Sequence, residues 1–310
     1  MIMKNYTYTS LIVWILIATT SWATAQNVVV NTTKKYNNIK QIEVESGWLD
    51  VSYQGGEGTE VSVEAYLESN IPDQDIVFVT LGDVLKVSYK RSGEKYNWNS
   101  KNKGYLKISG PKSIKLSVRG SSGKIDLTNL ESENTVLQLT SGTVVAAQIK
   151  GNLKLNSTSG TLKVSGIEGN VEARLTSGNA YFENISGGVK YESTSGSLDA
   201  KNIDGEVNVR LTSGNAKIEN AKQLGSLAFT SGNVRAVNSG LGPNTQFFGT
   251  SGNFTIQTPS TLNSFNYSLR ATSGNLRIGG SSGTKSLELN NNASTWIKGT
   301  ITSGHITIEN

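Results

Sequence analysis

Apolar residues alternate with polar residues in short segments along most of the chain, and glycines separate the segments. The segment that contains Val171, Ala173 and Leu175 is one example. Alternation with a period of two places the apolar side chains on one face of a β-strand. Beyond residue 25, no segment shows the helical period that indicates an amphipathic α-helix. The pattern therefore predicts an all-β protein.

The alternating segments recur at a fixed interval. The tripeptide Thr-Ser-Gly occurs nine times, and its glycine returns every 18 residues over the central part of the chain. The glycines are Gly142, Gly160, Gly178, Gly196, Gly214 and Gly232, followed at wider intervals by Gly252, Gly274 and Gly304. Such a period is typical of a solenoid, in which each repeat packs only on its neighbours. A second glycine, such as Gly169, divides each repeat into two. We predict a β-solenoid, like a parallel β-helix or β-roll, with rungs of about 18 residues and two short strands per rung.

Outward charges distinguish an 18-residue rung from a 36-residue rung. The shorter rung places Glu192 between Arg174 and Arg210, whereas the longer rung stacks the two arginines. Two more columns alternate in the same way, and they are Lys154–Glu172–Lys190 and Glu183–Lys201–Glu219. Opposite charges on neighbouring strands stabilise a sheet by about 0.2–1 kcal/mol per pair. The charge pattern therefore favours the 18-residue rung.

Other places in the repeat also carry one residue type. Ile167, Ile185 and Ile203 share a place that we predict to be buried. The asparagines predict an amide ladder, and they are Asn184, Asn202, Asn220 and Asn238. Threonine and serine precede the turn glycine in each repeat, and we interpret them as turn residues whose hydroxyls bond to the backbone. An ice-binding face would instead need Thr-x-Thr on an outward sheet.

The chain divides into three predicted regions. Residues 1–25 are predicted to be a signal peptide, because Lys4 precedes an apolar core and a small-residue cleavage site ends at Ala25. Residues 26–112 are predicted to be an irregular N-terminal β segment that caps the solenoid, and residues 113–310 to be its repeats. No later segment is apolar enough for a transmembrane helix, so the mature chain is expected to have none.

The ends of this pattern resemble those of a known family. The chain opens its repeats with Ser46-Gly47-Trp48-Leu49-Asp50-Val51 and ends with Thr302-Ser-Gly-His-Ile-Thr-Ile-Glu309, with Thr-Ser-Gly-Asn repeats between them. This pattern resembles the bacterial putative-adhesin β-strand repeat family. The resemblance implies an exported β-solenoid of the bacterial envelope or cell surface, without catalytic residues. The insertions at residues 91–104 and 279–300 depart from the family pattern.

Composition excludes several kinds of site. The chain has no cysteine, which excludes disulfides and thiolate chemistry. Its single histidine, His305, stands at a place that other repeats give to asparagine, and no Gly-x-Ser-x-Gly motif occurs. The turns carry no repeated aspartate for calcium. Basic residues outnumber acidic ones by 29 to 24 but are scattered, which disfavours nucleic-acid binding. We expect no catalytic, cofactor or metal site.

The insertion at residues 89–105 is the predicted ligand site. It gathers aromatic and basic side chains between two strands, and the expected ligand residues are Tyr89, Arg91, Tyr96, Trp98 and Tyr105. Aromatic rings stack on sugars, and loops on rigid scaffolds often carry recognition. The alternative interpretation is a hairpin whose rings pack on the end of the solenoid.

The function predicted from sequence is that of an exported, non-enzymatic β-solenoid. It would serve as an adhesin, or as a surface or periplasmic module for binding and scaffolding, with carbohydrate or another envelope component as its partner. The alternative is a polysaccharide lyase or glycoside hydrolase on the same scaffold, which needs two suitably placed carboxylates. Outward acids that could serve are Asp199, Asp204, Glu206 and Glu219.

Overall fold

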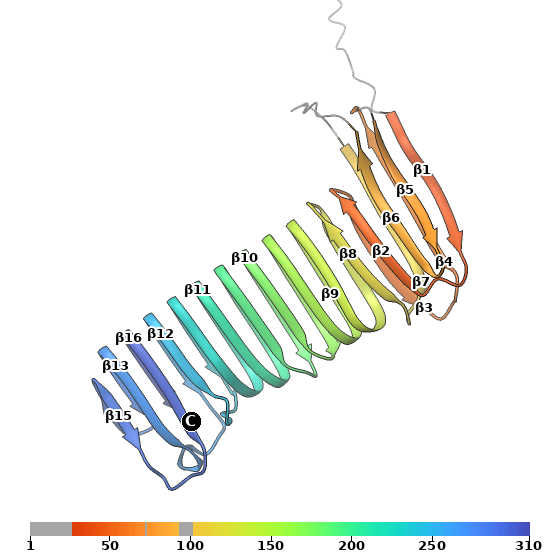
Figure 1. Cartoon of the computed structure of the whole chain (residues 1–310). Coiled ribbons are helices and arrows are strands. Elements are labelled where there is room, and N and C mark those ends of the chain that lie inside the picture. The colour runs from red at the N-terminus through yellow and green to blue at the C-terminus, as the bar shows by residue number, and fades with distance from the viewer. Residues whose placement is uncertain (1–26, 72, 93–101) are drawn as a thin grey trace, which may run out of the picture.

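The computed structural model describes residues 27–71, 73–92 and 102–310. Over these residues the chain forms one 16-stranded sheet that folds back on itself into two layers, and Figure 1 shows an elongated stack of bent strands. The one helical element described is a single 3-10 turn, η1 (Leu262–Ser264). The prediction of an all-β protein is confirmed. The signal peptide predicted for residues 1–25 lies outside the described residues.

The central repeats form long parallel strands. They are β9 (Lys124–Glu168), β10 (Val171–Ile185), β11 (Val189–Val237) and β12 (Gln246–Gln257). In the register, Val171 lies beside Leu153 on one side and Val189 on the other, each 18 residues away. Pairing continues through the Thr-Ser-Gly turn, so the two alternating halves of a repeat are parts of one bent strand rather than two separate strands.

The turn glycines let the backbones of neighbouring rungs touch. Gly178 has φ of 134°, in the region that favours glycine, and a Cβ built there would lie 2.0 Å from the carbonyl oxygen of Gly160. The same approach repeats at Gly196, where a Cβ would lie 2.1 Å from the Gly178 oxygen. Glycine is therefore required at this corner by both conformation and space.

Asparagine occupies the opposite corner. Asn184, Asn202, Asn220 and Asn238 all have positive φ, a conformation that asparagine tolerates better than most residues. Their side-chain amides bond from rung to rung, with Nδ2 to Oδ1 distances of 2.9, 2.9 and 2.8 Å. The predicted amide ladder is confirmed.

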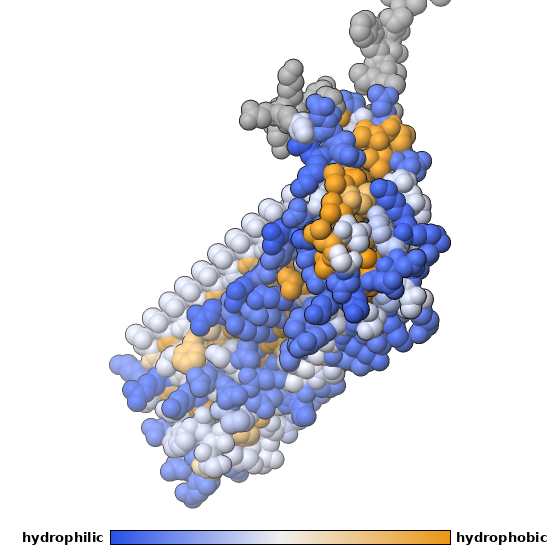
Figure 2. All heavy atoms as spheres, turned by 45° about the vertical axis from the view of Figure 1, so that its right-hand side comes forward, coloured by the Kyte–Doolittle hydropathy of each residue, from blue (hydrophilic) through white to orange (hydrophobic). Residues whose placement is uncertain are grey.

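The threonines beside the turn behave differently from the prediction. The row of pale spheres along one edge in Figure 2 is the Thr-Ser-Gly turn of successive rungs. Thr140, Thr158 and Thr176 are exposed, and their hydroxyls have no hydrogen-bond partner within the described residues. The expectation that these hydroxyls bond to the backbone is wrong, because the corner directs them into solvent.

The core lies between the two layers and follows the alternation of the sequence. Ile167, Ile185 and Ile203 are at most 1% exposed, which confirms the predicted buried column. Phe182 meets Tyr191 edge to face with ring centroids 6.1 Å apart. The buried Tyr191 hydroxyl donates to the carbonyl oxygen of Ser197 at 3.3 Å, so its polar end is satisfied.

The N-terminal region continues both layers of the stack. Its strands are β1 (Asn27–Tyr36), β2 (Gln41–Gly47), β3 (Asp50–Gly56), β4 (Val61–Ser69), β5 (Gln74–Leu81), β6 (Val84–Arg91), β7 (Asn102–Pro111) and β8 (Lys115–Gly120). One layer has the order β8-β2-β6-β5 and the other β3-β7-β4-β1. Because β8 and β3 both pair with β9, the sheet is continuous across the domain boundary predicted at residues 112–113.

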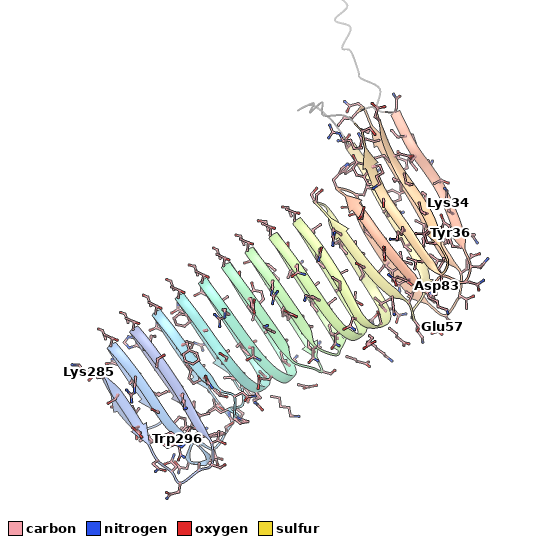
Figure 3. All side chains as sticks on the ribbon, in the orientation of Figure 1. Lys34, Tyr36, Glu57, Asp83, Lys285 and Trp296 are labelled. Carbon is pink, nitrogen blue, oxygen red and sulfur yellow. The ribbon has the colours of Figure 1, made fainter. Side chains whose placement is uncertain are left out.

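Strands β1 and β5 each have a partner on one side only. Val28, Val29, Val79 and Leu81 on these strands are 40–58% exposed, and Figure 2 shows apolar surface at this end. Lys34 of β1, labelled in Figure 3, lies over the ring of Phe78 with Nζ 4.4 Å from its centroid. Charged side chains on an edge strand oppose pairing with another chain.

At the C-terminal end, the order of the stack departs from the order of the chain. The strands are β13 (Asn266–Ile278), β14 (Ser281–Gly283), β15 (Ser286–Leu289) and β16 (Trp296–Glu309). β16 lies between β12 and β13, so Gly304 stands between Gly252 and Gly274. β14 and β15 pair antiparallel with β13 and cover the last edge, where Figure 3 labels Lys285 and Trp296.

Outward charges interleave along the rungs. Arg174 reaches Glu172 at 3.0 Å and Glu192 at 3.1 Å, and Lys154 lies 3.7 Å from Glu172. On the other layer, Lys217 lies 2.6 Å and Lys201 3.7 Å from Glu219. Glu183 lies beside Lys201 in the register, but the two side chains form no ion pair in the described part of the chain.

Two of these carboxylates should make stability depend on pH. Burial alone would raise the pKa of Glu192, but Lys190 and Arg174 hold it below its usual range. The hydrogen bond from Lys217 lowers the pKa of Glu219. Between the lowered pKa and the ordinary value of about 4.3, the unfolded chain binds more protons than the folded chain. This stability is therefore present above about pH 4.3 and is lost as pH falls through the folded pKa values.

We expect the melting temperature to fall between pH 5 and pH 3, measured by circular dichroism in buffers of about equal ionic strength. The double variant Glu192→Gln, Glu219→Gln should show a smaller fall, since it has lost these two titrations. An equal fall in both proteins would contradict the assignment to these two carboxylates.

Candidate binding face

The three predicted ligand residues that the structure describes do not form one surface. Tyr89 of β6 is partly buried against the hydrophobic core. Its ring meets Trp48 edge to face with centroids 5.9 Å apart, and its hydroxyl donates to Gln74 Oε1 at 2.7 Å. Arg91 is half-buried on the same strand, opposite Gln74 in the ladder. Tyr105 of β7 belongs to the other layer. The predicted residues Tyr96 and Trp98 lie outside the described residues, so their role stays a prediction.

Tyr105 faces outward within a satisfied network. Its ring stacks on Tyr66 with centroids 5.4 Å apart, and its hydroxyl donates to Glu64 at 2.7 Å. This hydrogen bond raises the pKa of Tyr105. Lys107 Nζ lies 4.4 Å from the Tyr105 centroid, and the Tyr66 hydroxyl donates to Glu68 at 2.8 Å. The tyrosines here are thus already engaged by neighbouring side chains. The outward place of Tyr66 follows from the alternation in β4, but the sequence prediction did not include it.

A different tyrosine stands open to solvent. Tyr181 of β10 is 47% exposed, and its hydroxyl has no hydrogen-bond partner in the described residues. In the register it lies between Lys163 and Asp199 on the outward face of its layer. We call this surface the Tyr181 face, defined by the outward column Lys163, Tyr181, Asp199, Lys217 and Arg235.

Two shallow hollows meet at the Tyr181 ring. The first, of about 620 Å3, includes Lys163 on the N-terminal side of the ring and reaches Asp199 and Lys201 on the other side. The second, of about 420 Å3, extends farther toward the C-terminal side and includes Asn215 and Lys217. An aromatic ring flanked by open space on both sides offers a face on which a flat apolar group can stack.

Polar groups surround this ring. Lys201 Nζ lies 3.9 Å from Asp199 Oδ1, a buried oxygen that accepts no hydrogen bond in the described part of the protein, while the Asp199 side chain as a whole is 33% exposed. Lys163 and Arg235 form no ion pair with any described residue. Acceptor and donor groups beside an aromatic platform suit a ligand that has both apolar faces and hydroxyls. In the sequence, the signal for Tyr181 is an aromatic residue at an outward place of the repeat, and the predicted ligand residues did not include it.

The acidic residues that the sequence offered for catalysis lie in different surroundings and do not form one cluster. Glu206 accepts hydrogen bonds from the amides of Asn208, Gln223 and Asn244 at 2.8–3.0 Å, which ties the loop before β12 to the stack. Glu219 is paired with lysines, as described above. Asp204 lines a hollow of about 630 Å3 together with Glu168. No group of three metal-binding side chains occurs among the residues that the structure describes.

The single histidine takes the place of asparagine in a ladder. His305 Nδ1 accepts the backbone N–H of Asn275 at 3.1 Å, and the His305 N–H donates to Asn253 Oδ1 at 3.1 Å. Asn233 makes the equivalent contact in an earlier rung, where its backbone N–H donates to Asn215 Oδ1 at 3.2 Å. His305 therefore has a structural role that its place in the repeat predicted.

A family model identifies the repeats. The model described as Toastrack DUF4097 matches residues 39–210 and again residues 205–309, which together span nearly the whole described chain. The chain belongs to the Toastrack DUF4097 family. The resemblance to a family of adhesin-like β-strand repeats is thereby confirmed.

Solved structures with matching chains are described in similar terms. A putative adhesin from Bacteroides fragilis is 12% identical, with 91% of this Toastrack chain and 97% of that chain covered and a TM-score of 0.36. A putative adhesin from Parabacteroides merdae is 15% identical over 89% and 95%, with a TM-score of 0.30. A putative cell adhesion protein from Clostridium sporogenes is 10% identical over 90% and 99%, with a TM-score of 0.21.

Two further comparisons bear on this Toastrack protein. No curated protein matches its sequence. Within the described residues, no helix has the length and apolar character needed to cross a membrane.

Proposed function

We propose that this Toastrack protein is an exported, non-enzymatic adhesion module that binds carbohydrate on the Tyr181 face. The observation that carries the proposal is the Tyr181 ring, exposed and without a hydrogen-bond partner in the described chain, between two hollows. Sugar rings have apolar faces that stack on aromatic side chains and hydroxyls that bond to charged groups. Asp199 can accept from such hydroxyls, and Lys163 and Lys217 can donate to them.

The shape of the stack supports binding of an extended ligand. Successive outward side chains along the Tyr181 face are separated by the strand spacing of about 4.8 Å. A polysaccharide lying along the axis would meet several rungs at once, so weak contacts would add up without a deep pocket. Solenoids use such extended surfaces for recognition.

Export to the bacterial envelope is the second part of the proposal. It is supported by the signal-peptide pattern in residues 1–25, with its basic residue, apolar core and small-residue cleavage site. The absence of cysteine also suits a chain that folds outside the cytoplasm without disulfides.

The proposal is tested with a glycan array and the purified mature chain. Replacing Tyr181 with Ala should weaken binding to the recognised glycan by about tenfold, since the stacking platform is lost. The melting temperature should stay unchanged because the ring is exposed. The variant Tyr181→Trp should retain binding.

Phe248 supplies the matched control. It is 41% exposed on the other layer, so Phe248→Ala removes an exposed ring without touching the Tyr181 face. Binding that is lost equally in both alanine variants, or kept in Tyr181→Ala, would contradict the proposed site.

A polysaccharide-processing enzyme is the alternative function. One observation favours it: Glu168 and Asp204 line the same hollow, and two carboxylates at a suitable separation can cleave a glycosidic bond. Release of reducing ends from a bound polysaccharide, abolished by Asp204→Asn, would support the enzyme over the adhesion module.

A further inference from the structure

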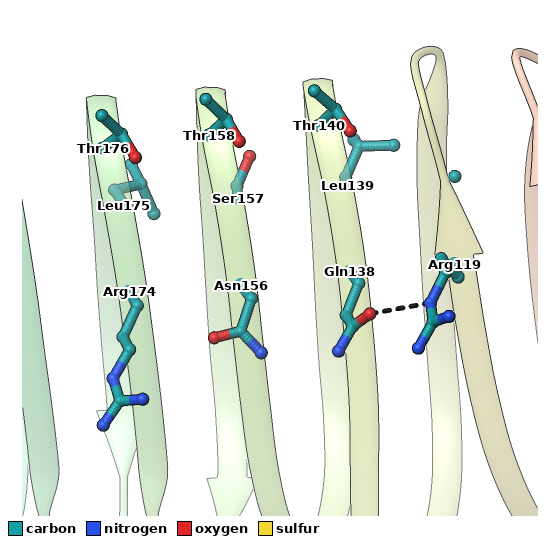
Figure 4. A pocket seen from close by; sticks show the side chains of 11 residues that line it. Arg119, Gln138, Leu139, Thr140, Asn156, Ser157, Thr158, Arg174, Leu175 and Thr176 are labelled. Atoms are coloured by element: carbon teal, nitrogen blue, oxygen red, sulfur yellow. Dashed lines mark hydrogen bonds between the residues drawn. The ribbon is translucent and has the colours of Figure 1, made fainter.

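A groove crosses the layer of the stack that does not carry the Tyr181 face, and it runs along the edge formed by the Thr-Ser-Gly turns. It has a volume of about 450 Å3 and extends from Arg119 of β8 across two rungs of β9 to Arg174 of β10. Figure 4 shows its side chains in two rows, with threonines at the turn and Arg119, Gln138, Asn156 and Arg174 below them. None of these residues belongs to the Tyr181 face.

The groove lies where one rung has a smaller side chain than its two neighbours. Ser157 occupies the place that Leu139 and Leu175 hold in the rungs on either side. The same small residue recurs at Ser193, but there Tyr191 is two residues earlier, fully buried, and closes the space. At Ser157 the corresponding residue is Leu155, which is smaller than tyrosine. Ser157 and Leu155 together fill less volume than the pair that contains Tyr191. Because the rest of the layer is closely packed, this difference leaves a depression at the surface of this rung.

The lining is rich in hydrogen-bond donors and carries no carboxylate. Arg119 Nε donates to Gln138 Oε1 at 2.8 Å, and Arg119 forms no ion pair in the described structure. Arg174 is already paired with Glu172 at 3.0 Å and with Glu192 at 3.1 Å, and neither glutamate lines the groove. The exposed hydroxyls of Thr140, Thr158 and Thr176 stand beside them without protein partners in the described chain.

These groups have a regular spacing. Arg119 and Arg174 are three strand positions apart in the register, which corresponds to about 14 Å. Gln138 and Asn156 stand between them in the same outward row. A ligand that fits must therefore bring negative charge to the Arg119 end, which has no ion pair in the described chain, and polar groups to the middle and to the Arg174 end. Guanidinium groups bind carboxylate and sulfate with paired hydrogen bonds, and amides and hydroxyls bind sugar hydroxyls.

We propose that this groove is a second, independent binding site for a segment of acidic polysaccharide, with an anionic group at Arg119 and sugar hydroxyls at the threonines and amides that extend from it toward Arg174. The shared chemistry is a carbohydrate chain that bears carboxylate or sulfate. The site does not depend on carbohydrate binding at the Tyr181 face.

The test is titration calorimetry of the purified mature chain with three probes of similar length. These are an oligogalacturonate, a sulfated dextran oligosaccharide and an uncharged dextran oligosaccharide. We expect binding of at least one acidic probe and none of the uncharged probe at the groove. The carboxylate and sulfate probes distinguish the two possible anionic groups. Failure of both acidic probes to bind would overturn the proposal.

Variants then locate the binding. Arg119→Gln should weaken binding of the acidic probe about tenfold or more, because it removes a charge-assisted contact. Arg210→Gln is the matched control, since Arg210 lies in the same outward row but outside the groove. Equal weakening by both variants would mean non-specific attraction to a basic protein and would overturn the site.

A filling variant tests the shape of the groove without changing charge. Ser157→Leu places the residue of the two neighbouring rungs in the depression and should abolish binding while the melting temperature holds or rises. If that variant fails to fold, the comparison of Arg119→Gln with Arg210→Gln still decides whether the acidic probe binds in the groove. Tyr181→Ala should leave binding of the acidic probe unchanged, so failure of the Tyr181 face and failure of the groove give different results. Binding that persists unchanged in folded Ser157→Leu would overturn the proposal.

Discussion

Replacing Gly178 with Ala should lower the free energy of unfolding by more than about 4 kcal/mol, a loss that few single substitutions cause. The added Cβ would lie 2.0 Å from the Gly160 carbonyl oxygen, and that oxygen belongs to the backbone of a neighbouring rung that cannot move aside alone. The residue would also have to adopt φ near 134°, which alanine strongly disfavours. Denaturant unfolding followed by circular dichroism measures the loss.

Gly58→Ala is the control for this experiment. A Cβ at Gly58 meets nothing within 4 Å, and the residue is exposed. Its free energy of unfolding should change by less than about 0.5 kcal/mol. If Gly178→Ala were as stable as Gly58→Ala, the rungs would not contact each other through their turn backbones.

Truncating Ile185 to Ala should cost about 2–5 kcal/mol of unfolding free energy. The side chain is 1% exposed and lies between Ile167 and Ile203 in the register, so its removal leaves a cavity bounded by two rungs. Neighbours in a stacked sheet are held by backbone hydrogen bonds and can collapse into that cavity only partly. The same denaturant measurement applies.

Two companions show whether the loss comes from the cavity. Ile185→Val removes a single methylene and should cost about 0.5–1.5 kcal/mol. Thr194→Ala changes an exposed residue of the adjacent turn and should be nearly neutral. A near-neutral Ile185→Ala would place the inward face of the rung elsewhere.

The regular repeats could be predicted in detail because each residue lies beside the equivalent residues of the two adjacent rungs. Ile185 is buried for the same reason as Ile167, and Asn202 bonds as Asn220 does, so spacing alone places them. The charge columns follow because Arg174 and Glu192 lie side by side at the strand spacing. His305 was also predictable, since it occupies a place that other repeats give to asparagine.

The ends and the binding surfaces could not be predicted in the same way. Tyr89 looked like a loop aromatic, but its strand places it inward against Trp48. The order β12-β16-β13 has no signal in the sequence, because the intervals from Gly252 to Gly274 and Gly304 fit either order. The groove at Ser157 depends on which residues stand beside a small side chain, so it emerges from packing across rungs rather than from any motif.

The position of β16 has a consequence for the order in which the chain folds during synthesis. A chain that emerges N-terminus first presents β13 before β16, yet β13 bonds in parallel only to β16. Until the 14 residues of β16 arrive, β12 has an open edge and β13 has only its short antiparallel cover. We therefore expect β16 to pair with β12 on one side and with β13 on the other after both of those strands have been synthesised. On this expectation, the C-terminal end of the stack is completed last, and a chain that stops before β16 leaves β12 and β13 without their shared partner.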